Sequence, residues 1–276
     1  MILVTGASGH VGGELVELLA DRGRQVRALV RDPADSGVRP GVEVVGGDLN
    51  RPESLFEALR GVDGVFLLGG FSDMSGVLAR AKAAGVGHVV LLSSRSVVGG
   101  HLDNAVVGMH MGSEAAVHES GIEWTVLRPS GFMSNTFEWV GQLSAGDVVR
   151  APFADASIAT IDPYDIASVA AAVLGRAEHF GQNHPLSGPA ALLPADRVEI
   201  LAKVLGRPLR FEGQPDGEAR DEMSRTIPAK YVEAFFRFFV DGEFDDTPVL
   251  PTVEELTGRP PRTFEEWAAT HAKAFR

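Results

Sequence analysis

The sequence predicts an α/β fold with a doubly wound parallel sheet, and three observations support this prediction. Short apolar runs rich in Val, Ile and Leu alternate with helical patterns up to about residue 130. The runs are as short and as continuously apolar as strands that are buried on both faces. A glycine-rich turn follows the first run, at the position where such folds bind ligands.

Six strands are expected before residue 130. They cover residues 2–5, 26–30, 42–45, 64–68, 88–92 and 124–127. Between the first two strands, Val11, Leu15, Leu18 and Leu19 follow a spacing that places them on one face of a helix. Strands that alternate with helices imply right-handed crossover connections and therefore a parallel sheet.

The glycine-rich turn has the chemistry of a phosphate-binding loop. Its residues 6–12 read GASGHVG, with the glycine spacing G-x-x-G-x-x-G. Gly6 permits a tight turn, Gly9 lets the backbone approach a phosphate, and Gly12 lets the helix pack closely on the strand. The N-terminus of the following helix offers N–H groups and a positive dipole to an anion. The turn therefore predicts a Rossmann core that binds a dinucleotide.

The ends of the second and third strands indicate which dinucleotide is bound. Arg31 follows the second strand, where an arginine pairs with a 2′-phosphate, so NADP(H) is the preferred cofactor. Asp32 keeps NAD(H) open, because a carboxylate at this strand end accepts a hydrogen bond from the ribose hydroxyl. Asp48 and Leu49 follow the third strand, where Asp48 is placed to contact the adenine, to cap the next helix, or both.

The regular alternation of apolar runs and helical patterns ends after Pro129. Helices are expected at residues 164–174, 189–205 and 228–240, and no long linker separates them from the first part. We therefore expect a dinucleotide-binding Rossmann core over residues 1–150. Residues 151–276 are expected to form a small C-terminal α/β substrate lobe that completes the same fold.

Composition excludes several classes of function. The chain has 276 residues and a net charge of −12, which argues against nucleic acid or an anionic membrane as a partner. The absence of cysteine excludes thiol nucleophiles and thiolate metal sites, and the eight histidines form no metal-ligand pattern. We expect no signal peptide and no membrane helix, and hence a soluble cytoplasmic protein.

Several short motifs together resemble one known family. They are residues 5–12 (TGASGHVG), 29–33 (LVRDP), 47–49 (GDL), 61–63 (GVD), 127–129 (LRP), 132–135 (FMSN), 165–167 (DIA) and 186–189 (LSGP). This set is similar to that of the atypical short-chain dehydrogenase/reductases of the NmrA-like, NAD(P)H-binding group. The resemblance implies a Rossmann fold and a bound NAD(P)H. The group includes quinone, azo-dye, triphenylmethane and ether reductases, polyketide-tailoring enzymes and non-catalytic redox sensors.

The proton-donating motif of typical short-chain dehydrogenases, Tyr-x-x-x-Lys, is missing. Neither Tyr164 nor Tyr231 has a lysine four residues later, and the family spacing places His110 and Glu114 at the Tyr and Lys positions. A positioned general acid contributes about 10²–10⁴ in rate, which an unactivated ketone needs. A quinone accepts hydride readily and needs orientation more than a strong acid. His110 is either a proton donor or a structural helix residue, and we expect Glu114 to be structural or solvated.

The expected site lies over the carboxyl ends of the strands. The expected catalytic residues are His110 and Ser94, and the expected substrate contacts are Phe71, Met133 and Trp139. The expected cofactor-binding residues are Gly6, Ala7, Ser8, Gly9, His10, Val11, Gly12, Arg31, Asp48, Leu49, Gly69, Gly70, Ser93, Ser94, Pro129 and Phe132. The phenylalanines of residues 235–239 either line a flat apolar pocket or pack a helix on the core.

Together these features favour an NAD(P)H-dependent reductase of a small quinone-like or conjugated aromatic carbonyl substrate. One variant is the reductase part of a polyketide (anthraquinone) hydroxylation step with a partner enzyme, because hydroquinones react with dioxygen. The main alternative is a non-catalytic NADP(H)-binding redox sensor of the NmrA type, which the missing Tyr and Lys fit equally well. A lyase or isomerase with a structural cofactor has no specific support, and the sequence carries no signal for an oligomeric state.

Overall fold

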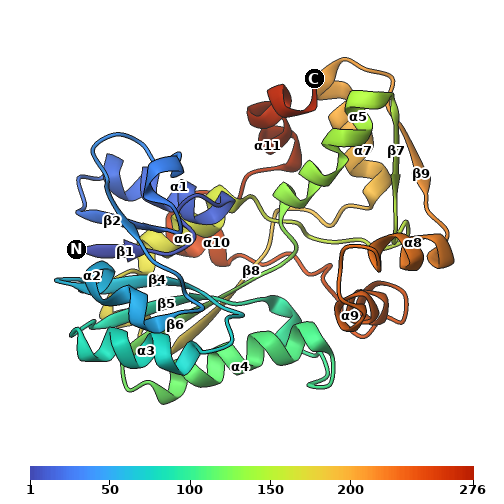
Figure 1. Ribbon diagram of the computed structural model, residues 1–276. Coiled ribbons are helices and arrows are strands. Elements are labelled where there is room, and N and C mark those ends of the chain that lie inside the picture. The colour runs from blue at the N-terminus through green and yellow to red at the C-terminus, as the bar shows by residue number, and fades with distance from the viewer.

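A seven-stranded parallel sheet forms the centre of the protein, with the strand order β3-β2-β1-β4-β5-β6-β8 (Figure 1). The computed structural model describes residues 1–276, apart from the side chain of residue 35. The strands are β1 (Ile2–Val4), β2 (Val26–Val30), β3 (Glu43–Gly46), β4 (Gly64–Leu68), β5 (His88–Leu92), β6 (Glu123–Pro129) and β8 (Gln182–Leu186). The order reverses at β1, so a crevice for a ligand opens between the loops that leave β1 and β4. The predicted doubly wound fold is confirmed.

Helices cover both faces of the sheet. Those on one face are α1 (His10–Asp21), α6 (Pro163–Val173) and α10 (Thr252–Thr257), and those on the other are α2 (Phe56–Leu59), α3 (Met74–Ala83) and α4 (Ala105–Glu119). In Figure 1, α1, α6 and α10 lie above the sheet, and α3 and α4 lie below it. This is the layering that alternating strands and helices predict.

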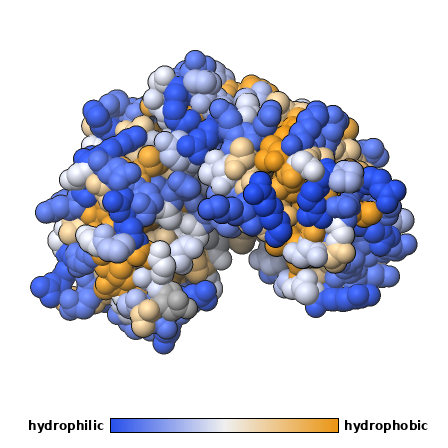
Figure 2. Space-filling model, turned by 90° about the horizontal axis from the view of Figure 1, so that it is seen from above, coloured by the Kyte–Doolittle hydropathy of each residue, from blue (hydrophilic) through white to orange (hydrophobic). Residues whose placement is uncertain are grey.

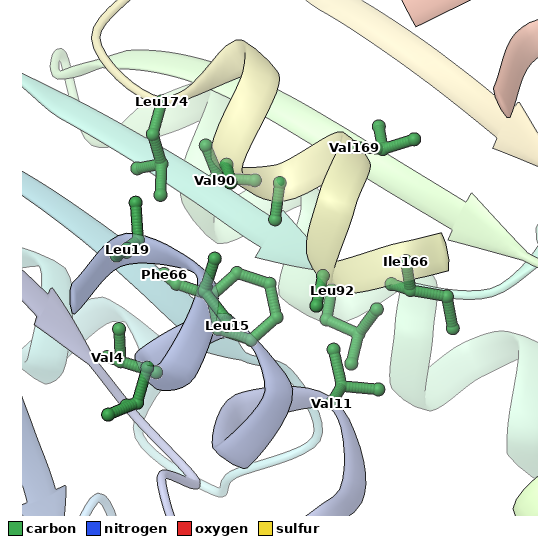
Figure 3. Packing of buried hydrophobic residues seen from close by; sticks show 14 of the residues in the cluster. Val4, Val11, Leu15, Leu19, Phe66, Val90, Leu92, Ile166, Val169 and Leu174 are labelled. Carbon is green, nitrogen blue, oxygen red and sulfur yellow. The ribbon is translucent and has the colours of Figure 1, made fainter. Parts of the chain in front are cut away.

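The core between the sheet and its upper helices explains the apolar pattern of both. Leu15 and Leu19 of α1 and Ile166 of α6 belong to one buried cluster with Phe66 and Val90 of the sheet (Figure 3). All five side chains are at least 95% buried. Burying a large apolar side chain stabilises a fold by roughly 1.5–3 kcal/mol, so this layer holds the helix behind the glycine-rich turn rigidly in place.

A smaller lobe lies beside the sheet, on the right in Figure 1. Its elements are α5 (Val140–Ala145), β7 (Val148–Ala151), α7 (Pro194–Leu205), β9 (Arg210–Gly213), α8 (Asp216–Met223), α9 (Ala229–Phe239) and α11 (Phe264–His271). Strands β7 and β9 pair in parallel as a separate two-stranded sheet. An indentation separates the lobe from the sheet on one side of the molecule (Figure 2).

The six expected strands are present within two residues of their predicted bounds, whereas β7, β8 and β9 were not predicted. Strand β8 contains Pro185 and has exposed polar residues, which an edge strand tolerates because one side is unpaired. The division at residue 150 stays a prediction. Strand β8 and helices α6 and α10 belong to the sheet side, while α5 belongs to the lobe. None of the helices in the described chain is long and apolar enough to cross a membrane.

Candidate functional site

Two adjacent cavities lie along the carboxyl ends of the strands. The first, which we call the glycine-loop groove, has a volume of about 490 Å³ and extends from the glycine-rich turn to the ends of β2 and β3. The second, which we call the aromatic cavity, has a volume of about 460 Å³ and lies between the sheet and α9. Leu68, Leu92 and Phe132 line both cavities. The two cavities are therefore adjacent at these three side chains.

The glycine-rich turn has the backbone geometry that a pyrophosphate requires. Gly6 has a φ of +62°, in the left-handed region that favours glycine. A Cβ on Gly12 would lie 2.2 Å from the carbonyl oxygen of Gly6, so only glycine lets α1 pack this closely on the turn. Gly9 caps α1 with extended backbone, and the N–H groups of the first helical turn border the groove. These N–H groups and the helix dipole fit a dinucleotide phosphate.

The end of β2 presents a cation to the same groove. Arg31 is exposed, lines the groove and forms no ion pair with the side chains that the structure describes. Asp32 instead accepts a hydrogen bond from the N–H of Ala34 at 2.9 Å, as the cap of a short 3₁₀ turn. The guanidinium is therefore available to a 2′-phosphate, while one oxygen of the Asp32 carboxylate is engaged within the turn.

Asp48 is placed to contact the adenine, but the prediction that it caps the next helix is wrong, because that 3₁₀ helix (Pro52–Leu55) has Arg51 at its cap position and no side-chain cap hydrogen bond. The residue lines the groove, and its carboxylate accepts a hydrogen bond from the N–H of Asn50 at 2.9 Å. This hydrogen bond lowers the pKa of Asp48, so the carboxylate is ionised at neutral pH.

Aromatic side chains form most of one wall of the aromatic cavity. Phe235, Phe238 and Phe239 of α9 line it, together with Phe132 and Phe244. Phe236 lies on the opposite face of α9 and packs against Ala219 and Val232. Both alternatives for this run therefore hold in part, because three of its four phenylalanines line the cavity and one packs in the lobe.

Helix α4 carries the two residues at the positions of the missing motif. Glu114 is 2% exposed and accepts hydrogen bonds from Nε of Arg128 at 3.0 Å, Nη2 of Arg128 at 2.6 Å and Oγ of Ser93 at 2.6 Å. It is therefore a structural residue that joins α4 to β5 and β6. His110 lies one turn earlier, lines the aromatic cavity, and has a buried Nδ1 without a hydrogen-bond partner in the described chain. Burial lowers the pKa of His110, so the imidazole is neutral at neutral pH.

A buried carboxylate, Asp246, also lines the aromatic cavity, and sequence reasoning missed it. It lies in the loop after α9, and its Oδ2 accepts a hydrogen bond from the N–H of Gly131 at 3.0 Å. Its Oδ1 lies 3.5 Å from Nη1 of Arg95. Burial raises the pKa of Asp246 to about 6, against the lowering effects of the Gly131 N–H and Arg95. No motif marks this residue, since an Asp in an acidic surface loop has no distinctive spacing.

The comparisons with known proteins agree with this geometry. The profile of the NmrA-like family matches residues 1–268. The chain belongs to the NmrA-like family. The resemblance drawn from the short motifs is thereby confirmed.

Two curated relatives span the whole chain. A (4-alkanoyl-5-oxo-2,5-dihydrofuran-3-yl)methyl phosphate reductase of Streptomyces griseus is 44% identical and covers 100% of this chain and 99% of its own. An NAD(P)H azoreductase of Xenophilus azovorans is 34% identical with the same coverage. Among solved structures, an NADPH-dependent quinone oxidoreductase from Escherichia coli has a TM-score of 0.80 and 25% identity. That likeness covers 99% of this chain and 100% of the other.

Most residues predicted for the site of this NmrA-like protein lie in the two cavities. Those in the glycine-loop groove are Gly6, Ser8, Gly9, His10, Val11, Gly12, Arg31, Asp48, Leu49, Phe71 and Phe132. Those in the aromatic cavity are Gly69, Ser93, Ser94, His110, Pro129 and Phe132. Ser94 accepts a hydrogen bond from the hydroxyl of Ser96 at 3.0 Å, which leaves its own hydroxyl proton free for a ligand.

Five predicted residues lie elsewhere than expected. Met133 and Trp139 are each 1% exposed and pack in the core of the lobe, so the prediction that they contact substrate is wrong. The chain turns into the lobe directly after β6, which carries both side chains away from the cavity. Phe71 lines the groove instead of the aromatic cavity. Ala7 is buried behind the turn, and the N–H of Gly70 donates to Oγ of Ser113 at 2.9 Å.

Proposed function

We propose that this protein reduces a flat, conjugated, electron-poor acceptor, such as a quinone or a conjugated carbonyl compound, with hydride from NADPH. One observation carries the proposal. A cavity lined by phenylalanines adjoins the cofactor groove at Leu68, Leu92 and Phe132. His110, at the position of the missing Tyr, lines the same cavity. The protein is an NAD(P)H-dependent oxidoreductase.

The names of the relatives support an NAD(P)H-dependent reductase and indicate the kind of acceptor that it reduces. Their names specify an unsaturated lactone with an alkanoyl group and a phosphate, an azo compound, and a quinone. A lactone of this kind, an azo dye and a quinone are all conjugated acceptors. We infer that this chain acts on the same general kind of acceptor, with its own cavity wall selecting the compound.

The groove fits NADP(H) through groups present in this chain. The N–H groups at the start of α1 would hold the pyrophosphate, and Arg31 would hold the 2′-phosphate. When bound, NADPH would supply the hydride for the reduction. Phe132 lines both cavities and thereby helps to hold the acceptor against the donor.

The aromatic cavity orients the acceptor and excludes water. Phe235, Phe238 and Phe239 offer flat apolar surfaces on which a conjugated ring stacks. The hydroxyl of Ser94 and the neutral imidazole of His110 donate hydrogen bonds to an acceptor oxygen as it becomes negative. A phenolate product is already stabilised, so hydrogen bonds of this kind are sufficient for the reaction.

The experiment is a steady-state assay of NADPH oxidation against a panel of acceptors. The panel contains a benzoquinone, a naphthoquinone, an azo dye, an unsaturated lactone and cyclohexanone. We expect kcat/KM for at least one conjugated acceptor to exceed that for cyclohexanone by at least about 10², the lower bound for the contribution of a general acid. Equal reduction of cyclohexanone would contradict the proposal, and binding of NADPH without oxidation by any acceptor would favour the redox-sensor alternative.

A further inference from the structure

A third cavity lies beside the glycine-rich turn, between α1 and α11, and we call it the α1–α11 cavity. It has a volume of about 200 Å³ and shares no lining residue with the aromatic cavity. With the glycine-loop groove it shares only Gly9 and His10. In Figure 1, α11 lies on the side of the lobe that faces α1. This space is therefore distinct from the proposed cofactor and acceptor sites.

Four rings from three segments border the α1–α11 cavity and contact one another. Phe137 stacks on His10 of α1, with 5.2 Å between the ring centroids and 26° between the ring planes. The centroid of Phe137 also lies 5.2 Å from that of Trp267 and 5.4 Å from that of His271, both in α11. The face of a Phe or Trp ring attracts a cation that lies within about 6 Å of its centroid. These rings therefore form the kind of wall that binds an ammonium group.

Two carboxylates border the same cavity. Glu14 of α1 is half-buried and forms no hydrogen bond or ion pair with the residues that the structure describes. Asp162 is 2% exposed, and its ion-pair partner Arg262 is 3.5 Å from its Oδ2. The guanidinium of Arg262 also lies over the ring of Tyr164, 3.6 Å from the centroid. The cavity thus holds one carboxylate without a partner and one with a distant partner.

The charges around Glu14 favour a cationic ligand. Burial raises the pKa of Glu14, the negative charges of Asp162 and Glu17 raise it further, and Arg262 lowers it. The raised pKa means that the surroundings penalise the ionised carboxylate, and a cation in the cavity would relieve this penalty. Glu17 also lines the cavity, but Nη1 of Arg39 lies 2.8 Å from its Oε2. Glu14 is therefore the carboxylate left for an incoming cation.

The indole N–H of Trp267 is a second, independent indication of a ligand. Trp267 is 1% exposed, lines the cavity and donates no hydrogen bond to the described residues. A buried donor without a partner is rare, and a hydroxyl oxygen in the cavity would satisfy it. In the part of the chain that the structure describes, no three His, Asp or Glu side chains are grouped to hold a metal ion. The lining therefore favours an organic cation that carries a hydroxyl group.

We propose that the α1–α11 cavity binds a small amino alcohol in its cationic form. The ammonium group contacts Glu14 and the rings of Phe137 and Trp267, and the hydroxyl oxygen accepts a hydrogen bond from the indole N–H. A volume of about 200 Å³ equals the share of roughly seven water molecules in the liquid, so the cavity is the size of a compact ligand. This inference goes beyond the proposed reduction, because it involves no residue assigned to hydride transfer.

The test compares choline with its neutral carbon analogue, 3,3-dimethyl-1-butanol, which has the same shape and hydroxyl group but no charge. Saturation-transfer NMR at constant ionic strength follows the methyl signal of each ligand, without cofactor or acceptor. We expect choline to bind with a Kd of about 1 mM or lower. The analogue should bind at least about tenfold more weakly, because only the cation is attracted by the carboxylates and the ring faces.

Glu14→Gln should weaken choline binding by at least about fivefold and leave the Kd of the analogue unchanged, because the amide keeps the shape of the carboxylate but not its charge. Asp21→Asn is the matched control. It removes the same charge from an exposed position of α1 outside the cavity, so the Kd of choline should not change. Thermal unfolding verifies that both variants are folded.

Three results would overturn the proposal. The first is equal affinity of the unsubstituted protein for choline and the analogue, which requires no variant. The second is the absence of saturable choline binding up to about 50 mM, far above the expected Kd. The third is an equal effect of Glu14→Gln and Asp21→Asn on choline binding. Because the assay contains no NADPH, none of these results bears on the proposed reductase activity.

Discussion

Replacing Glu114 with alanine tests whether the residue at the family's lysine position stabilises the fold or takes part in catalysis. Glu114 is 2% exposed and receives two hydrogen bonds from Arg128, whose side chain is 19% exposed, and one from Ser93. Removing one partner of a buried ion pair costs about 3–5 kcal/mol, because the other charge stays buried without compensation. A domain of this kind has about 5–15 kcal/mol of stability in total, so the loss is a large fraction of it.

The assay is urea unfolding at neutral pH, with the free energy of unfolding extrapolated to water. We expect Glu114→Ala to lose about 3–5 kcal/mol, and the double variant Glu114→Ala with Arg128→Met to recover part of this loss, because no unpaired charge is left. Glu114→Gln keeps an acceptor for Ser93 and should lose less. The reasoning would be refuted if Glu114→Ala unfolded within 1 kcal/mol of the unsubstituted protein, on the scale of an ordinary surface substitution, while hydride transfer fell 1,000-fold.

Three further predictions concern the cofactor, the acid group and acid stability. Arg31→Ala should weaken NADPH binding by about 1.5–3 kcal/mol, or roughly 10- to 150-fold in Kd, and leave the Kd of NADH unchanged. Calorimetry with both cofactors measures this, and an equal loss of affinity for both would contradict the prediction. His110→Phe should lower the single-turnover rate of quinone reduction by less than about tenfold. An obligatory general acid contributes ~10²–10⁴ in rate, so a loss of that size would identify His110 as the proton donor. His88 accepts a hydrogen bond from the N–H of Gly175 on Nδ1, and burial lowers its pKa from 6.5 to about 4. The unfolded chain therefore binds a proton that the folded protein does not, so stability should fall by up to about 3 kcal/mol as pH drops from 6.5 to 4. Denaturant unfolding across this range should show a shallower fall for His88→Asn, and an identical fall would exclude His88 as the cause.

The sheet and the cofactor groove were predictable from sequence, because each depends on a local pattern. Strand β4 is an apolar run between turn residues, and the glycine spacing of residues 6–12 is determined by contacts within the turn itself. Strand β8 was missed because it is an edge strand, where exposed polar residues and Pro185 cost little. Its place in the sheet depends on pairing with β6, which no local pattern reports.

The acceptor side of the site was predicted less well, because it is assembled from segments far apart in the chain. Asp246 reaches Gly131 across more than 100 residues, and the position of α9 decides which phenylalanines face the cavity. Trp139 was expected to contact substrate, whereas the chain enters the lobe immediately after β6 and buries this side chain there. Long-range packing of this kind leaves no signature in spacing or composition.

Only the aromatic cavity draws on the C-terminal part of the chain, and this has a consequence for how the activity can diversify. The residues that line the glycine-loop groove all lie between positions 6 and 132, whereas Phe235, Phe238, Phe239, Phe244 and Asp246 reach only the aromatic cavity. Acceptor choice is therefore a modular property. Exchanging the segment of residues 229–250 between family members would transplant acceptor preference and leave dinucleotide preference behind, which makes this segment the natural unit for directed evolution.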